Sequence, residues 1–150
     1  MDLAELLTEP FETSTLEWAT LPLRLVLGVI ILHAGYGKFA RGIGGFGSWL
    51  GELGYRLPQS TARAVATLEV LGGLALLAGL FTHWVAIPLA ANMVVATYTN
   101  AAKVHLPFAG NDHQQGYELD VLMVGALIAL VLGGAGPLSL DQLLGDAFVG

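Results

Sequence analysis

The feature that most constrains this sequence is a long stretch with almost no charge. Between residues 64 and 102 the only formally charged side chain is Glu69. A helix that spans a bilayer needs about 20 mostly apolar residues, so this stretch must hold two spans. Polar groups and an interfacial tryptophan interrupt it at residues 82–84. This break predicts one span at residues 61–81 and another at 84–104, joined by a tight hairpin.

Two further apolar segments flank this pair. The first is predicted to span at residues 21–39, with Thr20 as the helix N-cap and Pro22 in the first turn, where its missing N–H is harmless. The last is predicted at residues 116–133 and is short, because Gly and Pro residues end it. The sequence therefore predicts an all-α integral membrane protein, a bundle of four transmembrane helices.

Shorter elements connect and follow these spans. Residues 40–60 are rich in Gly but carry aromatic and Leu side chains, which predicts a short interfacial helix, and residues 107–117 form the other sizeable loop. Ser139 can cap a small amphipathic helix after the last span. The expected organisation is an acidic N-terminal tail at 1–20, a membrane domain at 21–144 and a C-terminal tail at 145–150.

Composition supports lipid as the solvent and excludes several functions. Hydrophobic residues make up 55% of the chain and charged residues only 12%, about half the usual share. A net charge of -6, with six basic residues, argues against a nucleic-acid partner. Cysteine is absent, so the chain has no thiolate nucleophile and no cysteine-ligated cluster. Any redox chemistry must therefore use a borrowed cofactor or another subunit.

Basic residues are unequally divided between the two faces of the predicted bundle. Both larger loops emerge on one face, which receives five basic residues, whereas the face of the termini receives only Arg24. The positive-inside rule then places the loops in the cytoplasm and both termini outside, in a multi-pass protein of the cytoplasmic membrane. The five residues are Lys38, Arg41, Arg56, Arg63 and Lys103.

Small residues recur at helical spacing in three spans. In lipid, where apolar surface alone does not drive association, such residues permit close helix packing. They predict a compact bundle. The residues are Gly72, Gly73, Ala75 and Gly79 in the second span, Ala86, Ala90 and Ala91 in the third, and Gly125, Ala126 and Ala129 in the fourth.

Polar residues inside the spans gather in the half nearer the loops. Glu69 lies well inside its span, and a charge there is costly unless it has a purpose or a partner. One face of the third span carries Asn92, Thr99, Asn100 and Lys103, and Trp49 and Tyr55 are available from the loop side. The candidate catalytic residues are His33, Glu69 and Glu118, and the candidate ligand-binding residues are Tyr36, Lys38, Tyr98, Asn100 and Lys103.

Two interpretations of this polar layer remain open. In the functional one, Glu69 and His33 exchange protons or hydrogen-bond a ligand such as a quinone carbonyl. In the structural one, a buried network fixes the helix register, with Glu69 paired to His33 or Lys103, and Glu118 paired to Lys38. At the opposite end, Arg24 and Asp141 are predicted to form a structural ion pair.

Metal and haem sites are disfavoured. The four histidines, His33, His83, His105 and His113, match no zinc spacing, and His83 belongs to the opposite face from the others. Ligation of haem by His33 and His105 would require the loop to fold inward. The sequence predicts no metal site and argues against haem.

Several short motifs occur in a fixed order and spacing over residues 21–144. Their residues are Arg24, Leu27, Gly28, His33, Gly35, Lys38, Glu69, Gly72, Gly73, Leu76, Gly79, Tyr117, Glu118, Gly134, Gly136, Ser139, Leu140 and Asp141. Together they resemble the DoxX family of small four-helix membrane proteins. The resemblance implies a bacterial or archaeal cytoplasmic-membrane protein associated with oxidoreductase systems, including thiosulfate-to-quinone electron transfer and superoxide or thiol defence. It singles out the polar positions Arg24, His33, Lys38, Glu69, Glu118 and Asp141.

The expected function is a membrane subunit of a redox complex, whose loop-side polar layer receives a quinone or a small sulfur substrate. Its expected partners are the lipid bilayer, other protein subunits and this small molecule. The alternative is a non-catalytic scaffold subunit of a respiratory or photosynthetic assembly. A transporter is a weaker third reading, because four short spans leave little room for alternating access and no inverted repeat is evident.

Overall fold

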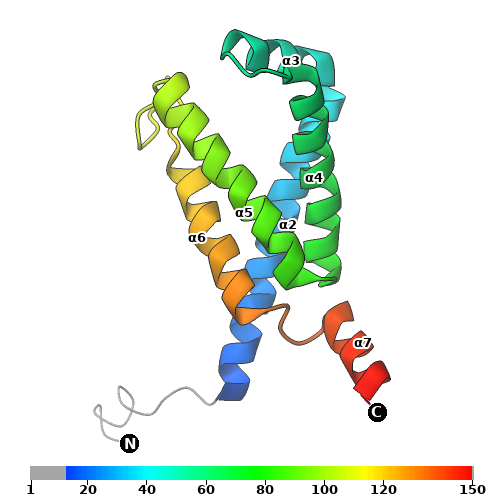
Figure 1. Cartoon of the computed structure of the whole chain (residues 1–150). Helices are drawn as coiled ribbons and strands as arrows, with labels where there is room; N and C mark the ends of the chain where they lie inside the picture. The colour runs from blue at the N-terminus through cyan, green and yellow to red at the C-terminus, as the bar shows by residue number, and fades with distance from the viewer. Residues whose placement is uncertain (1–12, 150) are drawn as a thin grey trace, which may run out of the picture.

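In a computed structural model the chain folds into helices, and no strand occurs in the part that the structure describes, residues 13–149 for the backbone and 18–144 for the side chains. Four long elements, α2, α4, α5 continued by η1, and α6, build the body, while α3 and α7 lie at its opposite ends (Figure 1). This confirms the predicted all-α four-helix bundle. The bounds are α2 Thr13–Ala40, α3 Ile43–Glu52, α4 Pro58–Ala78, α5 Thr82–Tyr98, the π-helix η1 Thr99–Lys103, α6 Glu118–Gly133 and α7 Leu140–Val149.

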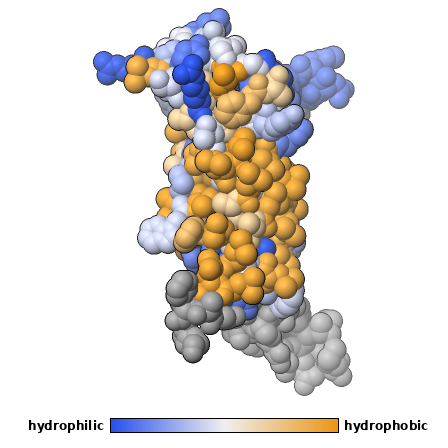
Figure 2. Space-filling model, turned by 90° about the vertical axis from the view of Figure 1, so that its right-hand side faces the viewer, coloured by the Kyte–Doolittle hydropathy of each residue, from blue (hydrophilic) through white to orange (hydrophobic). Residues whose placement is uncertain are grey.

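The length and surface of these helices suit a membrane. Three segments are long and apolar enough to cross one, namely Trp18–Ala40, Pro58–Ala78 and Thr82–Lys103. Helix α6 has 16 residues, about 24 Å at 1.5 Å per residue, and its charges lie in its first turn. Figure 2 shows one face with an apolar band around its middle and polar residues gathered at one end. The chain is a multi-pass membrane protein.

Helix α2 begins earlier than predicted. It starts at Thr13, so Pro22 lies inside the helix and Thr20 is not its N-cap. Proline at this position cannot donate to the carbonyl of Trp18 and crowds it, but membrane helices tolerate such interior prolines. The predicted acidic tail therefore divides: residues 13–20 are helical, and residues 1–12 lie outside the described residues. Helix α7 likewise runs into the segment expected to be a C-terminal tail.

Glycines bring α2 and α4 into close contact. A Cβ atom added at Gly73 would lie 2.7 Å from the backbone nitrogen of Leu32, and one at Gly35 would lie 2.8 Å from that of Val70. Both distances are shorter than a real Cβ contact, so only glycine allows this approach. The small residues of the second span therefore do mediate helix packing, as predicted.

Helices α5 and α6, the second pair after α2 and α4, pack against each other and against α4 through larger side chains. Leu89 of α5 fills the space beside Gly72, and the core continues into α6 through Met123, Leu127 and Leu130. Gly125 of α6 differs from the predicted pattern, because a Cβ there would meet no atom within 4 Å. The small-residue pattern thus identified the α4 interfaces, whereas in α6 Ala126 packs against the core and Gly125 does not.

A tight turn joins the pair α2 and α4 to the pair α5 and α6, at the end of the molecule where α2 begins. Gly79 ends α4 with a left-handed backbone (φ 66°), and Phe81 at φ 50° leads directly into α5. The predicted hairpin between the second and third spans is therefore present. At the other end α5 and α6 diverge from α4 (Figure 1), and this divergence positions the site described next.

Candidate functional site

An ion pair between Lys38 and Glu69 forms one side of the site. The Lys38 ammonium lies 2.5 Å from Glu69 Oε2, and Asn92 of α5 donates its Nδ2–H to Glu69 Oε1 at 3.2 Å. Glu69 is 3% exposed, so these two partners replace the water that a carboxylate requires. Gly35, which lets α2 approach α4 beside Glu69, lies three residues before Lys38 and therefore on the same helix face.

This pairing corrects the proposed structural network. Glu69 is paired with Lys38, and its other hydrogen-bond partner is Asn92, in place of His33 or Lys103. Lys38 is therefore not the partner of Glu118, which accepts a hydrogen bond from the backbone N–H of Gly110 at 3.1 Å. The reason is the close α2–α4 contact, which brings the end of α2 to Glu69 before any loop residue can reach it.

A second group of polar contacts lies where α5 ends. Asn100 donates its Nδ2–H to Asp120 Oδ2 at 2.7 Å, which links η1 to the first turn of α6. Tyr55 and Thr99 share a hydrogen bond of 2.6 Å between their hydroxyl groups. All four polar residues predicted on one face of the third span therefore have hydrogen-bond partners. These partners lie on α4, on α6 and in the turn before α4, because the π-helix changes the direction of the last residues.

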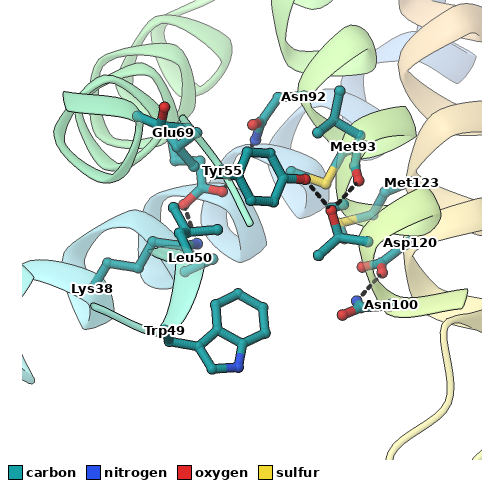
Figure 3. Close-up of a pocket in the computed structure, with 16 residues that line it drawn as sticks. Lys38, Trp49, Leu50, Tyr55, Glu69, Asn92, Met93, Asn100, Asp120 and Met123 are labelled. Atoms are coloured by element: carbon teal, nitrogen blue, oxygen red, sulfur yellow. Dashed lines mark hydrogen bonds and ion pairs between the residues drawn. The ribbon is translucent and has the colours of Figure 1, made fainter. Parts of the chain in front are cut away.

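A cavity of about 240 Å³ lies between these two groups. Its walls come from every long helix and from α3, as Figure 3 shows, with Lys38 and Glu69 on one side and Asn100 and Asp120 on another. Sites for drug-sized ligands measure about 300–1,000 Å³, so this cavity suits a single ring or headgroup. Its lining is Ala34, Lys38, Trp49, Leu50, Tyr55, Thr61, Val65, Glu69, Asn92, Met93, Val95, Ala96, Thr99, Asn100, Asp120 and Met123.

The formal charges of the residues that line the cavity do not sum to zero. Lys38 and Glu69 neutralise one another, and Asp120 is the remaining formally charged lining residue, so the lining carries a formal charge of -1. Lys103, the other cation nearby, donates to the carbonyl oxygen of Leu53 at 2.7 Å and stands 4.2 Å above the centre of the Tyr55 ring. The cavity therefore suits a neutral molecule better than an anion.

Four of the candidate residues lie away from this cavity. His33, Tyr36, Tyr98 and Glu118 are exposed and are absent from its lining. His33 lies two residues before Gly35, about 200° around the helix, so it points away from α4. The structure thus brings together Lys38, Glu69 and Asn100, with Lys103 at the margin.

Other lining residues were not assigned to the site from the sequence. Asn92 and Thr99 were visible as part of the third-span polar face, and Asp120 as an acidic residue at the start of a span. Trp49 and Tyr55 reach the cavity because α3 folds back onto α4, where Leu50 is buried. No spacing rule connects residues 49–55 to Glu69, so only the tertiary structure could assign them.

The opposite end holds the other buried charge. Arg24 is 1% exposed and donates to the carbonyl oxygens of Ala135 at 2.9 Å and Leu138 at 3.1 Å. Asp141 accepts the backbone N–H groups of Phe81 at 2.6 Å and Thr82 at 2.9 Å. The two residues predicted to form an ion pair, Arg24 and Asp141, therefore each bind backbone groups and do not touch, but their charges are near enough to attract each other.

The physical reason is the supply of backbone groups at this junction. The turn after α6 offers carbonyl oxygens to Arg24, and the start of α5 offers unpaired N–H groups to Asp141. Within the described side chains the ion pair at 4 Å or less is Lys38–Glu69. No group of three or more His, Asp or Glu side chains able to hold a metal occurs in that same part of the chain.

Comparison with known proteins assigns a family. Residues 19–102 match the DoxX family model. The chain is 34% identical over 125 residues to a Bacillus subtilis (strain 168) protein named "Putative oxidoreductase CatD", which covers 83% of this chain and 86% of the relative. No solved structure shows significant similarity. The match to the family model over more than half of the chain shows that this protein belongs to the DoxX family.

Proposed function

We propose that this protein is the membrane subunit of a redox system and that its cavity binds the ring of a quinone. The relative named as an oxidoreductase and membership of the DoxX family support a redox role. The observation that carries the ligand is the cavity itself, which is partly open and has mainly apolar walls with hydrogen-bonding groups at two sides (Figure 3). A quinone has this same pattern, a flat apolar ring with an oxygen at each end.

The hydrogen-bonding groups match carbonyl acceptors. Asn92 and Asn100 each use one amide N–H on a neighbouring carboxylate, and each carboxamide has a second N–H. These donors come from positions two helical turns apart on α5 and η1, so they can address opposite ends of one ring. Met93, Met123 and Trp49 supply the apolar and aromatic contacts that a flat ring requires.

The charge of the cavity favours a quinone over the sulfur substrate considered from the sequence. Thiosulfate carries two negative charges, and a lining with a formal charge of -1 and an already paired lysine opposes its entry. A neutral quinone meets no such barrier. Because the chain has no cysteine, any thiol chemistry must come from a partner subunit, and electrons must come from a borrowed cofactor or such a partner.

Orientation in the cytoplasmic membrane belongs to this proposal. The basic residues Arg41, Arg56 and Arg63 are exposed at the loop end, whereas Arg24 is buried at the other end and bound to carbonyl groups. The exposed arginines thus all lie at the loop end, which agrees with the sequence count and favours cytoplasmic loops. A single cysteine placed at exposed Ala109 should react with a membrane-impermeant maleimide only after cells are opened.

Fluorescence titration tests the ligand. In a Trp18→Phe/Trp84→Phe background, Trp49 is the one remaining tryptophan, and a short-chain naphthoquinone should quench it saturably. Asn92→Ala and Asn100→Ala should each weaken binding about tenfold, the effect of losing one good hydrogen bond. Gln115→Ala, an exposed loop variant, should bind as the parent does.

Two outcomes would overturn the quinone proposal. Quenching that does not saturate, or that is equal in all variants, would mean that the probe dissolves in the detergent without entering the cavity. Saturable binding of thiosulfate in place of the quinone would assign a sulfur substrate. Mass spectrometry and an absorption spectrum of the protein purified in mild detergent add the remaining comparison, since protein partners with no quinone and no saturable binding would support the scaffold alternative.

A further inference from the structure

The cavity lies between two parts of the molecule that touch unevenly. Helices α2, α3 and α4 form one part, and α5, η1 and α6 form the other. Near the turn at Gly79 the parts are packed closely, with Gly72 against Leu89. Toward the loop end α5 diverges from α4 (Figure 1), and polar side-chain contacts take over from apolar packing.

Three contacts bridge the two parts at this loop end. The hydroxyl groups of Tyr55 and Thr99 lie 2.6 Å apart. The ammonium of Lys103 donates to the carbonyl oxygen of Leu53 at 2.7 Å and also stands 4.2 Å above the Tyr55 ring. We call this set, Leu53 and Tyr55 on one side with Thr99 and Lys103 on the other, the clasp.

The direction of the central hydrogen bond can be assigned. Thr99 donates its single hydroxyl hydrogen to the carbonyl oxygen of Val95 at 2.7 Å, so its oxygen must accept from the Tyr55 hydroxyl. The Tyr55 hydroxyl group is therefore used within the protein, while its ring lines the cavity. Replacing tyrosine by phenylalanine removes this one hydrogen bond and keeps the wall.

Each half of the clasp sits on backbone that can change locally. Tyr55 follows Gly54, which has φ 81° and no atom within 4 Å of where a Cβ would be, so the turn there is not packed. Thr99 and Lys103 are the first and last residues of η1, a π-helix whose bonding differs from that of α5 before it. Short π-helical segments of this kind are frequent at functional sites.

We propose that the clasp is a gate: breaking the Tyr55–Thr99 hydrogen bond separates η1 from the turn before α4, and this widens the partly open cavity so that a ligand enters and leaves faster. This inference rests on the proposed function for the ligand, but the movement itself does not depend on it. Closed, the clasp holds Tyr55 and Thr99 as part of the cavity wall. Open, it separates η1 from the turn before α4 without disturbing the apolar packing beside Gly79.

The experiment measures opening and ligand exchange separately. Because the natural chain has no cysteine, spin labels can be placed at exposed Ser48 on α3 and Ala102 on η1 without background. Tyr55→Phe should move the distance distribution between the labels toward longer values in lipid nanodiscs. In stopped-flow measurements with the short-chain naphthoquinone, both association and dissociation should become about fivefold faster, the factor expected from one hydrogen bond, with Kd changed less than twofold.

Two further variants make the result decisive. Thr99→Val removes the same hydrogen bond from the other side and should reproduce both effects, which guards against a fault in the folding of one variant. Tyr117→Phe is the matched control, since the Tyr117 ring packs edge-on against Phe108 and is absent from the cavity lining. It should change neither the label distance nor the rates.

Other results would overturn the gate or separate it from its ligand. Unchanged label distances in both Tyr55→Phe and Thr99→Val would refute it. Weaker binding with unchanged association would instead make Tyr55 a direct ligand contact and also refute the gate. A protein that opens in both variants but binds no quinone would support the gate while rejecting the proposed ligand, because the label distances are measured without ligand.

Discussion

The two ends of the bundle each bury a charged side chain, but the groups that bind this side chain differ between the ends. At the end of the termini, the two terminal nitrogens of Arg24 are bound to backbone carbonyl groups and Asp141 to backbone N–H groups. At the loop end, Glu69 is bound to side chains from two other helices and faces a cavity. Backbone partners cannot leave without unfolding a segment, whereas side-chain partners can. With the proposed function, the first end is therefore built for stability and the second for exchange.

The largest effect should come from removing Arg24. Arg24→Met leaves the buried carbonyl oxygen of Ala135 and the part-buried one of Leu138 without their partner and weakens the attachment of the segment before α7, so the free energy of unfolding should fall by about 3 kcal/mol. Denaturation in mixed micelles followed by circular dichroism measures this. Arg41→Met, which removes an exposed arginine at the loop end, should change stability by less than about 0.5 kcal/mol. Equal effects of the two variants would contradict the difference between the ends.

A smaller loss is expected from breaking the pair at the loop end. Lys38→Met leaves the Glu69 carboxylate with Asn92 alone, and the stability loss should be about 2 kcal/mol, less than for a fully buried pair because Lys38 is 19% exposed. Adding Glu69→Gln removes the unpaired charge and should restore more than half of the loss. The same denaturation measurement tests both variants. No recovery in the double variant would mean that Lys38 acts mainly through packing.

The spans could be predicted from the sequence, but the ends of the helices could not. Apolar length and the polar break at residues 82–84 identify the four long helices, three of which are long and apolar enough to cross a membrane, because the bilayer imposes a minimum length on any helix that crosses it. The start of α2 was missed because Pro22 suggested a first turn, yet the helix continues through this proline, as membrane helices allow. Helix ends depend on such local energies, which are small beside the cost of an exposed backbone in lipid.

The candidate site was only partly predictable for a related reason. The sequence placed Glu69, Lys38 and Asn100 at one depth, and depth follows from position along a helix. Which way a residue points around its helix depends on the neighbouring helices, so His33 and Tyr98 were predicted at the right level but face outward. Trp49 and Tyr55 could not be assigned to the cavity, because α3 docks onto α4 through contacts that no sequence period reveals.

Asp141 and Asp120, one at each end of the bundle, allow a matched comparison in which smaller changes in the free energy of unfolding are expected. Asp141→Asn replaces one of the two carboxylate oxygens with an amide group that faces a backbone N–H, either that of Phe81 or that of Thr82. The start of α5 then loses a cap, and stability should fall by about 1 kcal/mol. Hydrogen exchange should become faster at the amides of Phe81 and Thr82. Unchanged exchange at both amides would show that the carboxylate does not cap this helix.

The smallest effect is expected for the corresponding change at the loop end. Asp120 accepts its hydrogen bond from the side-chain amide of Asn100, and an asparagine at position 120 can turn its own oxygen to the same donor, so Asp120→Asn should change stability by less than about 0.5 kcal/mol. The variant also removes the uncompensated negative charge of the cavity. Quinone affinity should therefore stay within about twofold, while binding of an anionic probe, thiosulfate, should become measurable by calorimetry. A stability loss as large as that of Asp141→Asn would mean that the loop end is held as rigidly as the other, and the distinction between an end built for stability and an end built for exchange would fail.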